Sequence, residues 1–251
     1  MITEYHRPST VEEALKLLRR KRPQTRPLGG GTVLSAPSAE AVAAVDLQDL
    51  GLNRISLRGQ NLHIGATATL QALLDTEGIP PALAAAMRHE ATYNLRQAAT
   101  VAGSLVAADG RSPFACAMLA LDAKLDMQPG DEKMSCGEVL ALRADKLRGR
   151  LITKITISTQ TALSYQYVSR TPADLPIVSI ALAQWPSGRT RLAVGGFGAT
   201  SRLALDGRDN SGLAEALENA IAEAGDQWAS AEYRLDAGRA LLTRAVAELQ
   251  S

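Results

Sequence analysis

The stretch Leu28-Gly29-Gly30-Gly31-Thr32-Val33-Leu34 places three consecutive glycines ahead of residues 41–47, an apolar run that reads as a buried strand. Glycine permits positive φ and a close approach of the backbone, so successive N–H groups can form a concave nest for phosphate oxygens. Thr32 adds a hydroxyl donor. The run has neither the GxGxxG nor the GxxxxGK[ST] pattern, and so short a match forms a structural turn more often than a nucleotide site.

A second stretch of small residues, Thr100-Val101-Ala102-Gly103-Ser104, contains two hydroxyl side chains and one glycine. Such a stretch suits backbone contact with a diphosphate. Taken alone, it is better explained as a tight entry into a helix. Two glycine-containing loops far apart in the sequence could, however, clamp an extended dinucleotide from two subdomains.

The spacing of apolar residues around these loops predicts both helices and strands. A hairpin is expected where residues 55–57 and 62–65 alternate across a short turn. The last third reads as a small α+β unit. The expected helices cover residues 9–22, 69–74, 81–91 and 113–121 and the chain from 212 onward, and the other expected strands cover 151–158, 165–168, 177–185 and 190–194.

The composition argues against polyanionic partners. The 251 residues include 27 basic and 26 acidic side chains, so the formal net charge is only +1. This balance gives no field that would attract nucleic acid or an anionic membrane. No apolar run approaches the roughly 20 residues of a membrane-spanning helix, and the N-terminus has no apolar signal core. We therefore expect a cytoplasmic protein with no membrane span and no nucleic-acid partner.

Metal sites and side-chain catalysis are not expected either. The two cysteines, Cys116 and Cys136, form no CxxC pair, and the three histidines stand singly, so the ligand spacings of zinc and iron–sulfur sites are missing. No serine lies in the GxSxG pattern of a hydrolase. His63 and His89 have no evident orienting partner in the sequence. No catalytic residue and no metal ligand are predicted.

The order of several motifs resembles the flavin-binding subunits of molybdenum hydroxylases, of the xanthine dehydrogenase and carbon monoxide dehydrogenase type. The first loop is similar to their Ala-Gly-Gly-Thr-Asp-Leu loop, and residues 94–104 resemble their Ile-Arg-Asn-x-Ala-Thr-Ile-Gly-Gly-Asn stretch. Residues 63–70 are similar to Ile-Gly-Ala-x-Thr-Thr-Leu, and residues 113–125 to a helix that ends in Leu-Ala-Leu-Asp-Ala. The resemblance runs from Tyr5 to about Leu249 in one order without large gaps.

This resemblance implies an α+β fold. A vanillyl-alcohol-oxidase-type FAD-binding domain of two α/β subdomains, the PCMH type, would cover residues 1–158, with subdomains of about 1–53 and 54–158. A small α+β C-terminal domain with a three-stranded sheet would cover residues 159–251. The implied cofactor is FAD, and the implied partners are a molybdopterin-binding large subunit and a 2Fe-2S small subunit. The flavin would pass electrons from the iron–sulfur partner to NAD or another acceptor.

Carried over position by position, the resemblance implies that the two loops contact the diphosphate and the ribityl chain, with Asp109 nearby. Two further segments would border the adenine or the isoalloxazine. One is the strand near Leu151 and Ile152, and the other is Tyr167, which stands at the family's usual lysine position. The cofactor-binding residues expected on this basis are Pro27, Leu28, Gly29, Gly30, Gly31, Thr32, Val33, Leu34, Ala99, Thr100, Ala102, Gly103, Ser104, Asp109, Leu151, Ile152 and Tyr167.

The sequence departs from the family pattern at four positions. Val33 replaces an aspartate, Ala102 the first glycine of a pair, Ser104 an asparagine, and Pro113 an aspartate that often reaches the flavin side. Backbone contacts to a diphosphate survive such changes, whereas lost side-chain acceptors weaken the hold on ribityl and flavin. Arg111 could compensate for these losses, because a guanidinium within reach of the diphosphate would add a charge-assisted hydrogen bond. The alternative is that Arg111 is a solvated arginine in a loop.

The departures leave two alternative functions open. The chain could be an FAD-less structural platform between a molybdopterin subunit and an iron–sulfur subunit. It could also be a stand-alone binding module for some other nucleotide, which only the glycine loops suggest. A subunit would co-purify with larger chains, whereas a stand-alone module would not.

Overall fold

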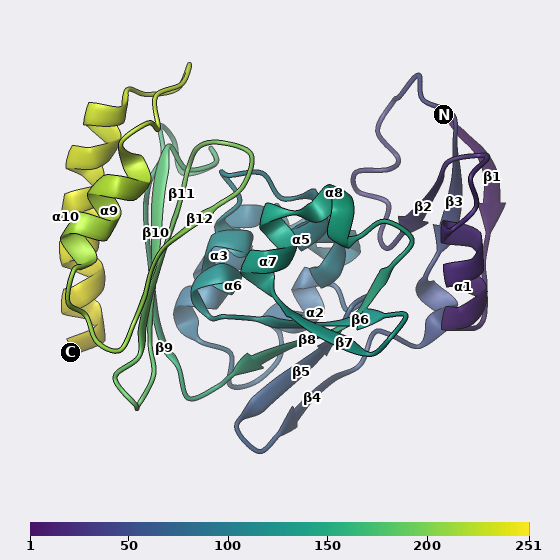
Figure 1. Ribbon diagram of the computed structural model, residues 1–251, viewed down its shortest axis with the longest axis horizontal. Coiled ribbons are helices and arrows are strands. Elements are labelled where there is room, and N and C mark those ends of the chain that lie inside the picture. Colours follow the sequence, from purple (N-terminus) through teal and green to yellow (C-terminus); the bar gives the residue numbers. More distant parts are fainter. Residues whose placement is uncertain (251) are drawn as a thin grey trace. The chain divides into compact units, whose positions relative to one another are not determined.

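A computed structural model describes residues 1–250 of the chain (Figure 1). The chain forms two compact units, and each unit collects segments that are separate in the sequence. The first unit comprises residues 1–76, 93–107 and 124–157. The second unit comprises residues 77–92 and 108–123 and the chain from Ser158 onward.

The first unit begins with a parallel three-stranded sheet in the order β1-β3-β2. The central strand β3 (Val42–Asp46) is buried along its whole length, which explains its uninterrupted apolar run. Thr10 caps the connecting helix by accepting a hydrogen bond from the backbone N–H of Glu13. The other elements of this part are β1 (Ile2–His6), α1 (Val11–Leu18), β2 (Thr25–Leu28) and a 3-10 turn (Gln48–Leu50).

The remainder of the first unit is a five-stranded sheet in the order β4-β5-β8-β6-β7 with short helices. The predicted hairpin is confirmed, because β4 and β5 pair antiparallel from Ile55↔Ile64 to Arg58↔Asn61. The strands are β4 (Ile55–Arg58), β5 (Asn61–Gly65), β6 (Lys124–Gln128), β7 (Glu132–Ser135) and β8 (Leu151–Ser158), and the helices are α2 (Leu70–Leu74), α4 (Tyr93–Ala98), α5 (Val101–Ala107), α7 (Cys136–Ala141) and α8 (Arg143–Lys146).

The second unit is built on an antiparallel four-stranded sheet in the order β12-β11-β10-β9. Helices α9 and α10 contact one face of this sheet, and α3 and α6 contact the other (Figure 1). The strands are β9 (Ala162–Val168), β10 (Val178–Gln184), β11 (Thr190–Gly195) and β12 (Arg202–Gly207), and the helices are α3 (Pro81–Glu90), α6 (Pro113–Ala120), α9 (Leu213–Ile221) and α10 (Ala231–Gln250).

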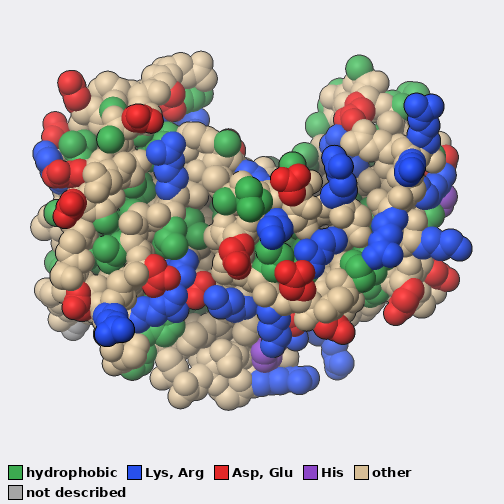
Figure 2. Space-filling view, in the orientation of Figure 1, with side chains coloured by type: hydrophobic (Ala, Val, Ile, Leu, Met, Phe, Trp, Pro, Cys, Tyr) green, Lys and Arg blue, Asp and Glu red, His purple; other side chains and the backbone are tan. Residues whose placement is uncertain are grey.

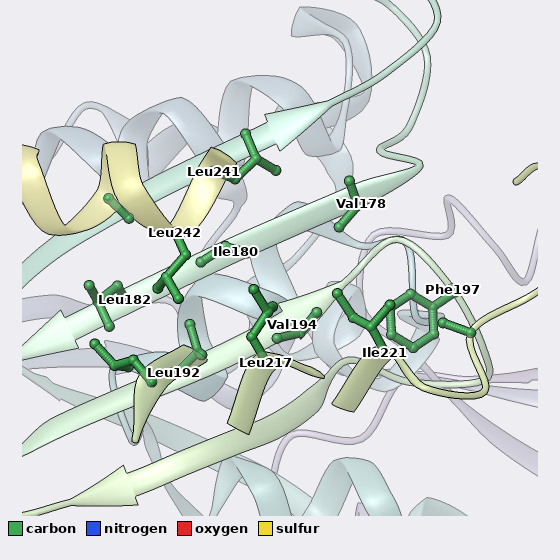
Figure 3. Packing of buried hydrophobic residues seen from close by; sticks show 13 residues of the cluster. Val178, Ile180, Leu182, Leu192, Val194, Phe197, Leu217, Ile221, Leu241 and Leu242 are labelled. Carbon is green, nitrogen blue, oxygen red and sulfur yellow. The ribbon is translucent and has the colours of Figure 1, made fainter. Parts of the chain in front are cut away.

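Large apolar side chains fill the layer between this sheet and helices α9 and α10 (Figure 3). Alternate residues of a strand share a face, so every second residue of β10 and β11 enters this layer. The antiparallel register sets Ile180 beside Val194 and Leu182 beside Leu192. Leu217 and Ile221 of α9 pack on these pairs and are fully buried. This layer is the main hydrophobic core of the second unit.

The opposite face of the same sheet carries small side chains, among them Ser179 and Ala181 of β10. Small residues let an alanine-rich helix approach closely, and all eight residues of α6 are buried. Cys116 lies in this layer, where burial raises the pKa of its thiol to about 12. The thiol is therefore protonated and serves as a packing group.

The predicted fold class is confirmed, with several differences in detail. The sheet of the second unit has four strands and not three, because Arg202–Gly207 adds an edge strand with partly exposed residues. Residues 101–107 form helix α5, although the sequence suggested a loop from 100 to 112. Strands β1, β2, β6 and β7 were not anticipated, since all four are short and largely exposed or interrupted in their apolar pattern. No described helix is long and apolar enough to cross a membrane.

A fully buried arginine ties the second unit together. The Arg234 guanidinium donates hydrogen bonds to the backbone carbonyls of Ile177, Ala224, Ala229 and Gly196. It also pairs with the Asp226 carboxylate at 2.8 Å, and this contact helps to lower the pKa of Asp226 against the effect of burial. All three guanidinium nitrogens are thus used, which is what makes a buried charge tolerable.

Replacing Arg234 with Met should lower the free energy of unfolding by about 3 kcal/mol, because several carbonyls and Asp226 would lose their donor. Urea denaturation followed by circular dichroism measures this change. Arg239→Met is the matched control, since Arg239 is 53% exposed and pairs with Glu218 at the surface, where such pairs contribute less than about 1 kcal/mol. Equal losses in the two variants would contradict the assigned role of Arg234.

Glu90 links α3 to the start of α6. Its carboxylate accepts hydrogen bonds from the Ser112 hydroxyl at 2.7 Å and from the Phe114 backbone N–H at 3.0 Å. Burial nevertheless raises the pKa of Glu90 above its usual 4.5, with the two hydrogen bonds acting in the opposite direction. The folded chain therefore holds this proton more tightly than the unfolded chain does.

Stability should depend on pH through this group. A raised folded-state pKa contributes stability that is complete below 4.5 and is lost as the pH rises through the raised pKa. Glu90→Gln has no proton to lose, so its stability relative to the unaltered chain should increase between pH 4.5 and pH 7. Urea unfolding at both pH values measures the trend. Glu223→Gln, at an exposed position, should show a smaller trend, and an equal one would refute the assignment.

Candidate functional site

A cleft of about 1730 Å³ lies within the first unit. Ligand pockets commonly measure roughly 300 to 1000 Å³, so this cleft is large enough for an extended dinucleotide. The end of α1, the glycine loop, the start of α5 and the segment around α8 and β8 all contribute to it. The main lining segments are residues 18–21, 24–38, 66–67 and 147–152, with Thr100, Ala102, Gly103, Val106, Ala107, Arg143 and Ala144.

The two glycine-containing stretches predicted from the sequence pack directly against each other. A Cβ atom on Gly30 would overlap the carbonyl oxygen of Ala98, so only glycine allows the backbone of the first stretch to lie so close to the second. A Cβ atom on Gly29 would lie 2.6 Å from the Thr100 hydroxyl. The structure therefore places the two stretches in direct contact within one unit.

The backbone N–H groups of the first stretch are free to bind a ligand. None of the six N–H groups from Gly29 to Leu34 donates to an acceptor in the described part of the chain. Gly31 has a φ of +74°, and the following turn is closed by a hydrogen bond from the Ser35 N–H to the Gly31 carbonyl. A run of unpaired N–H groups at the wall of a cleft is an anion-binding arrangement.

The second stretch differs, because its N–H groups from Val101 to Ser104 are already used. Val101 and Ala102 donate to the carbonyls of Ala68 and Ala66, at 2.8 and 3.2 Å. Gly103 and Ser104 donate to the hydroxyl and the carbonyl of Thr100. The backbone N–H groups at the start of helix α5 therefore already have acceptors within the protein. The second stretch supports the glycine loop and offers a ligand few donors of its own.

Thr100 is the contact point of the two stretches. It is only 6% exposed, and its hydroxyl accepts a hydrogen bond from the Gly103 N–H at 3.2 Å. Cβ atoms on Gly29 and Gly103 would each lie 2.6 Å from this hydroxyl. The three residues thus fix the position of the glycine loop relative to α5.

Most residues predicted to bind the cofactor line this cleft. Ala99 and Ser104 belong to the same unit but do not line it, and Ala99 is buried. Asp109 and Tyr167 belong to the second unit. The predicted residues that do line the cleft are Pro27, Leu28, Gly29, Gly30, Gly31, Thr32, Val33, Leu34, Thr100, Ala102, Gly103, Leu151 and Ile152.

In the second unit, the Tyr167 ring packs against the His89 ring at a tilt, with ring centroids 4.1 Å apart. His89 Nε2 lies 2.8 Å from the Asp174 carbonyl, so this nitrogen carries the proton and Nδ1 can accept from the Tyr165 hydroxyl at 3.3 Å. Burial raises the pKa of Tyr165. The partners of His89, invisible in the sequence, come from β9 and the loop that follows it.

Arg111 does not behave as either sequence interpretation suggested. Its guanidinium donates to the carbonyls of Leu175 and Pro176 at 2.6 and 2.9 Å and lies over the Trp228 ring at 4.5 Å. It therefore anchors a loop of the second unit and is neither a solvated side chain nor a free cation.

Several basic residues of the cleft were missed as site residues. Arg19 and Lys21 lie at the end of the helix expected over residues 9–22 and were not assigned to a site, and Arg143 and Arg148 were not singled out. The available signal was the density of arginine in residues 143–150, but charge density alone does not say that a segment faces a cleft. Among the described residues, no group of three or more His, Cys, Asp and Glu side chains could hold a metal ion.

Comparison with known proteins agrees with this geometry. Residues 1–158 match the profile of the family described as the FAD binding domain in molybdopterin dehydrogenase. The chain belongs to this family. It is accordingly an oxidoreductase-family chain, and the cofactor of the family is FAD.

Two relatives cover nearly the whole chain. A protein of Escherichia coli (strain K12), YgfM, described as uncharacterized, is 33% identical over 227 residues, which is 89% of this chain and 86% of the relative. The nicotine 6-hydroxylase medium subunit of Paenarthrobacter nicotinovorans is 26% identical and covers 97% of this chain and 96% of the relative.

Solved structures share the fold. A chain of the CO dehydrogenase from Oligotropha carboxidovorans superposes with a TM-score of 0.80 at 24% identity, covering 97% of this chain and 96% of that chain. A chain of quinoline 2-oxidoreductase from Pseudomonas putida 86 gives a TM-score of 0.79 at 21% identity, covering 98% and 96%. At this level of identity the likeness establishes the fold.

The residues of the cleft fit the diphosphate part of FAD. The glycine loop offers unpaired N–H groups, and the exposed Val33 side chain leaves its own backbone N–H open. Ala102 replaces a glycine without strain, because it lies in helix α5, where positive φ is not needed. Pro113, by contrast, is buried at the start of α6 and offers no polar group to a flavin.

Gly30→Ala should disrupt the site, because the added methyl group must displace the backbone at Ala98. Overpacking of this kind costs about 1 to 3 kcal/mol, and the purified variant should retain less FAD than the unaltered chain. Thermal unfolding and the absorbance of released flavin measure the two effects. Gly225→Ala is the matched control, since its nearest contact would be an ordinary 3.8 Å. Normal FAD content in Gly30→Ala would contradict the assignment.

Proposed function

We propose that this chain is the FAD-binding electron-transfer subunit of a molybdopterin-dependent hydroxylase or dehydrogenase. It would receive electrons from an iron–sulfur subunit and deliver them through FAD to NAD or another acceptor. The proposed partners are a molybdopterin-binding large subunit and a 2Fe-2S small subunit. The names of the similar proteins support this proposal, since one relative is the medium subunit of a hydroxylase.

The observation that carries the proposal is the run of unpaired N–H groups from Gly29 to Leu34 at the wall of a large cleft. A diphosphate needs several donors that converge on its oxygens, and backbone amides supply them without a conformational cost at the moment of binding. The Gly30–Ala98 packing holds these donors in place. We assign the diphosphate to residues 29–34 and place Leu151 and Ile152 beside the adenine or the isoalloxazine.

Within this proposal the chain binds and orients, and the redox chemistry is that of FAD. No side chain of the cleft is assigned a proton-transfer or nucleophilic role. The proposed domain organisation is an FAD-binding domain over residues 1–158 and a C-terminal domain over residues 159–251. The proposed compartment is the cytoplasm, which suits two cysteines that are both buried free thiols.

One observation favours a second candidate function. The N–H groups of residues 101–104 are consumed inside the protein, so the cofactor would find donors on one loop only. The departures Val33, Ser104 and Pro113 remove further polar groups. An FAD-less structural subunit of the same fold would show both features.

The visible absorption spectrum of the purified chain, before and after incubation with FAD, separates the two functions. The electron-transfer role predicts the bands of oxidised flavin at about one FAD per chain after removal of excess cofactor. A folded chain that retains no flavin at any FAD concentration would overturn the electron-transfer role and leave the structural one. Purification of the tagged chain from its native host tests the partners, which should appear as two further chains.

A further inference from the structure

Neither the glycine loop that would hold the diphosphate nor the second stretch that supports this loop contains a charged side chain. Residues 27–39 and 97–108 consist of apolar, small and uncharged polar residues only. A diphosphate diester carries one negative charge on each phosphate, and backbone N–H groups bring partial charges that do not neutralise it. The neutralising charge has to come from another wall of the cleft.

The cleft supplies such charge in excess. Its lining includes seven basic side chains and a single acidic one, Glu40. Three of the basic residues are neutralised locally, since Arg20 pairs with Glu4, Arg26 with Glu40 and Arg150 with Glu132. The seven are Arg19, Arg20, Lys21, Arg26, Arg143, Arg148 and Arg150.

The side chains of three of the remaining four make no ion pair or hydrogen bond in the described part of the chain: Arg19, Lys21 and Arg148. They come from two segments, the end of α1 and the turn after α8, that meet at Gly149. A Cβ atom on Gly149 would lie 3.1 Å from the Arg19 Cγ, so Arg19 packs directly beside the backbone next to Arg148.

The fourth residue, Arg143, is held by helix α5. Its Nη1 donates to the carbonyl oxygen of Val106 at 3.0 Å, in the last turn of α5. Val106 and Gly103 of the same helix line the cleft, and Gly103 contacts Thr100 beneath the glycine loop. This contact connects the basic segment to the wall that carries the glycine loop. Figure 2 shows Lys and Arg side chains gathered over the part of the first unit that carries α1, β2 and β3.

We propose that Arg19, Lys21, Arg143 and Arg148 form a cationic wall that neutralises the diphosphate of the bound dinucleotide, while the glycine loop supplies its hydrogen bonds. This assignment rests on the proposed function and adds residues that determine affinity. Guanidinium groups suit the task, because they present several donors in a plane that matches phosphate oxygens. Binding then selects for ligands with a diphosphate and weakens as salt rises.

Isothermal titration of the full-length chain with FAD, ADP and adenosine tests the wall. ADP carries the adenine and the diphosphate without the flavin, and adenosine lacks the phosphates. The double variant Arg19→Gln/Arg148→Gln should bind FAD and ADP roughly tenfold more weakly, as expected for two partly exposed charges, and adenosine unchanged. Its loss of affinity between low and high salt should also be smaller than that of the unaltered chain.

Two further variants make the result specific. Arg58→Gln removes an exposed arginine at the tip of the β4–β5 hairpin, away from the cleft lining, and should bind FAD like the unaltered chain. Arg19→Lys/Arg148→Lys keeps both charges and should restore most of the affinity. If FAD binds and the Gln double variant equals Arg58→Gln, the cationic wall is refuted and the proposed function stands. If the unaltered, folded chain binds neither FAD nor ADP, both are refuted.

Discussion

The carbonyl oxygen of Ala98 lies where a Cβ atom of residue 30 would have to be. Because Gly30 has none, the first glycine-containing loop rests directly on the stretch that enters α5, and Thr100 fills the space between Gly29 and Gly103. The rest of the candidate site depends on this contact. It holds the loop at the wall of the cleft without any hydrogen bond that would consume the loop's N–H groups.

The site therefore separates two tasks that a nucleotide site often combines. Hydrogen-bond donors come from the backbone of a loop that has no charge, and formal positive charge comes from side chains on other segments of the first unit. Such a division tolerates substitutions in the loop side chains, because the amide donors remain when Val33 or Thr32 changes. It restricts Gly29 and Gly30 more strongly, because a Cβ atom at either position would overlap the second stretch.

The second unit is stabilised mainly by the burial of both faces of its sheet. Its sheet is covered on both faces, so β10 and β11 are buried nearly throughout, and the two faces differ in side-chain size. Large residues face α9 and α10, and small residues face α6. Arg234 is embedded at the edge of this core and donates to four backbone carbonyls, three of which have no other donor among the described backbone groups.

Local sequence determined much of this protein. Four features could be recognised from a few neighbouring residues each. They are the apolar run of β3, the alternation in the β4–β5 hairpin, the capping residue Thr10 and the three glycines at 29–31. Together with the order of motifs along the chain, they were sufficient for the fold class and the family.

Tertiary structure alone decided how the donors and charges are used. The N–H groups of Val101 and Ala102 look as available in the sequence as those of Gly30 and Gly31, but the carbonyls of Ala68 and Ala66 take them. Arg111 and Arg148 are both loop arginines, yet one is bound to carbonyls of the second unit and the other lines the cleft of the first. Hydrogen-bond partners and burial are set by contacts between residues distant in the chain, and periodicity records only which face a residue shares with its near neighbours.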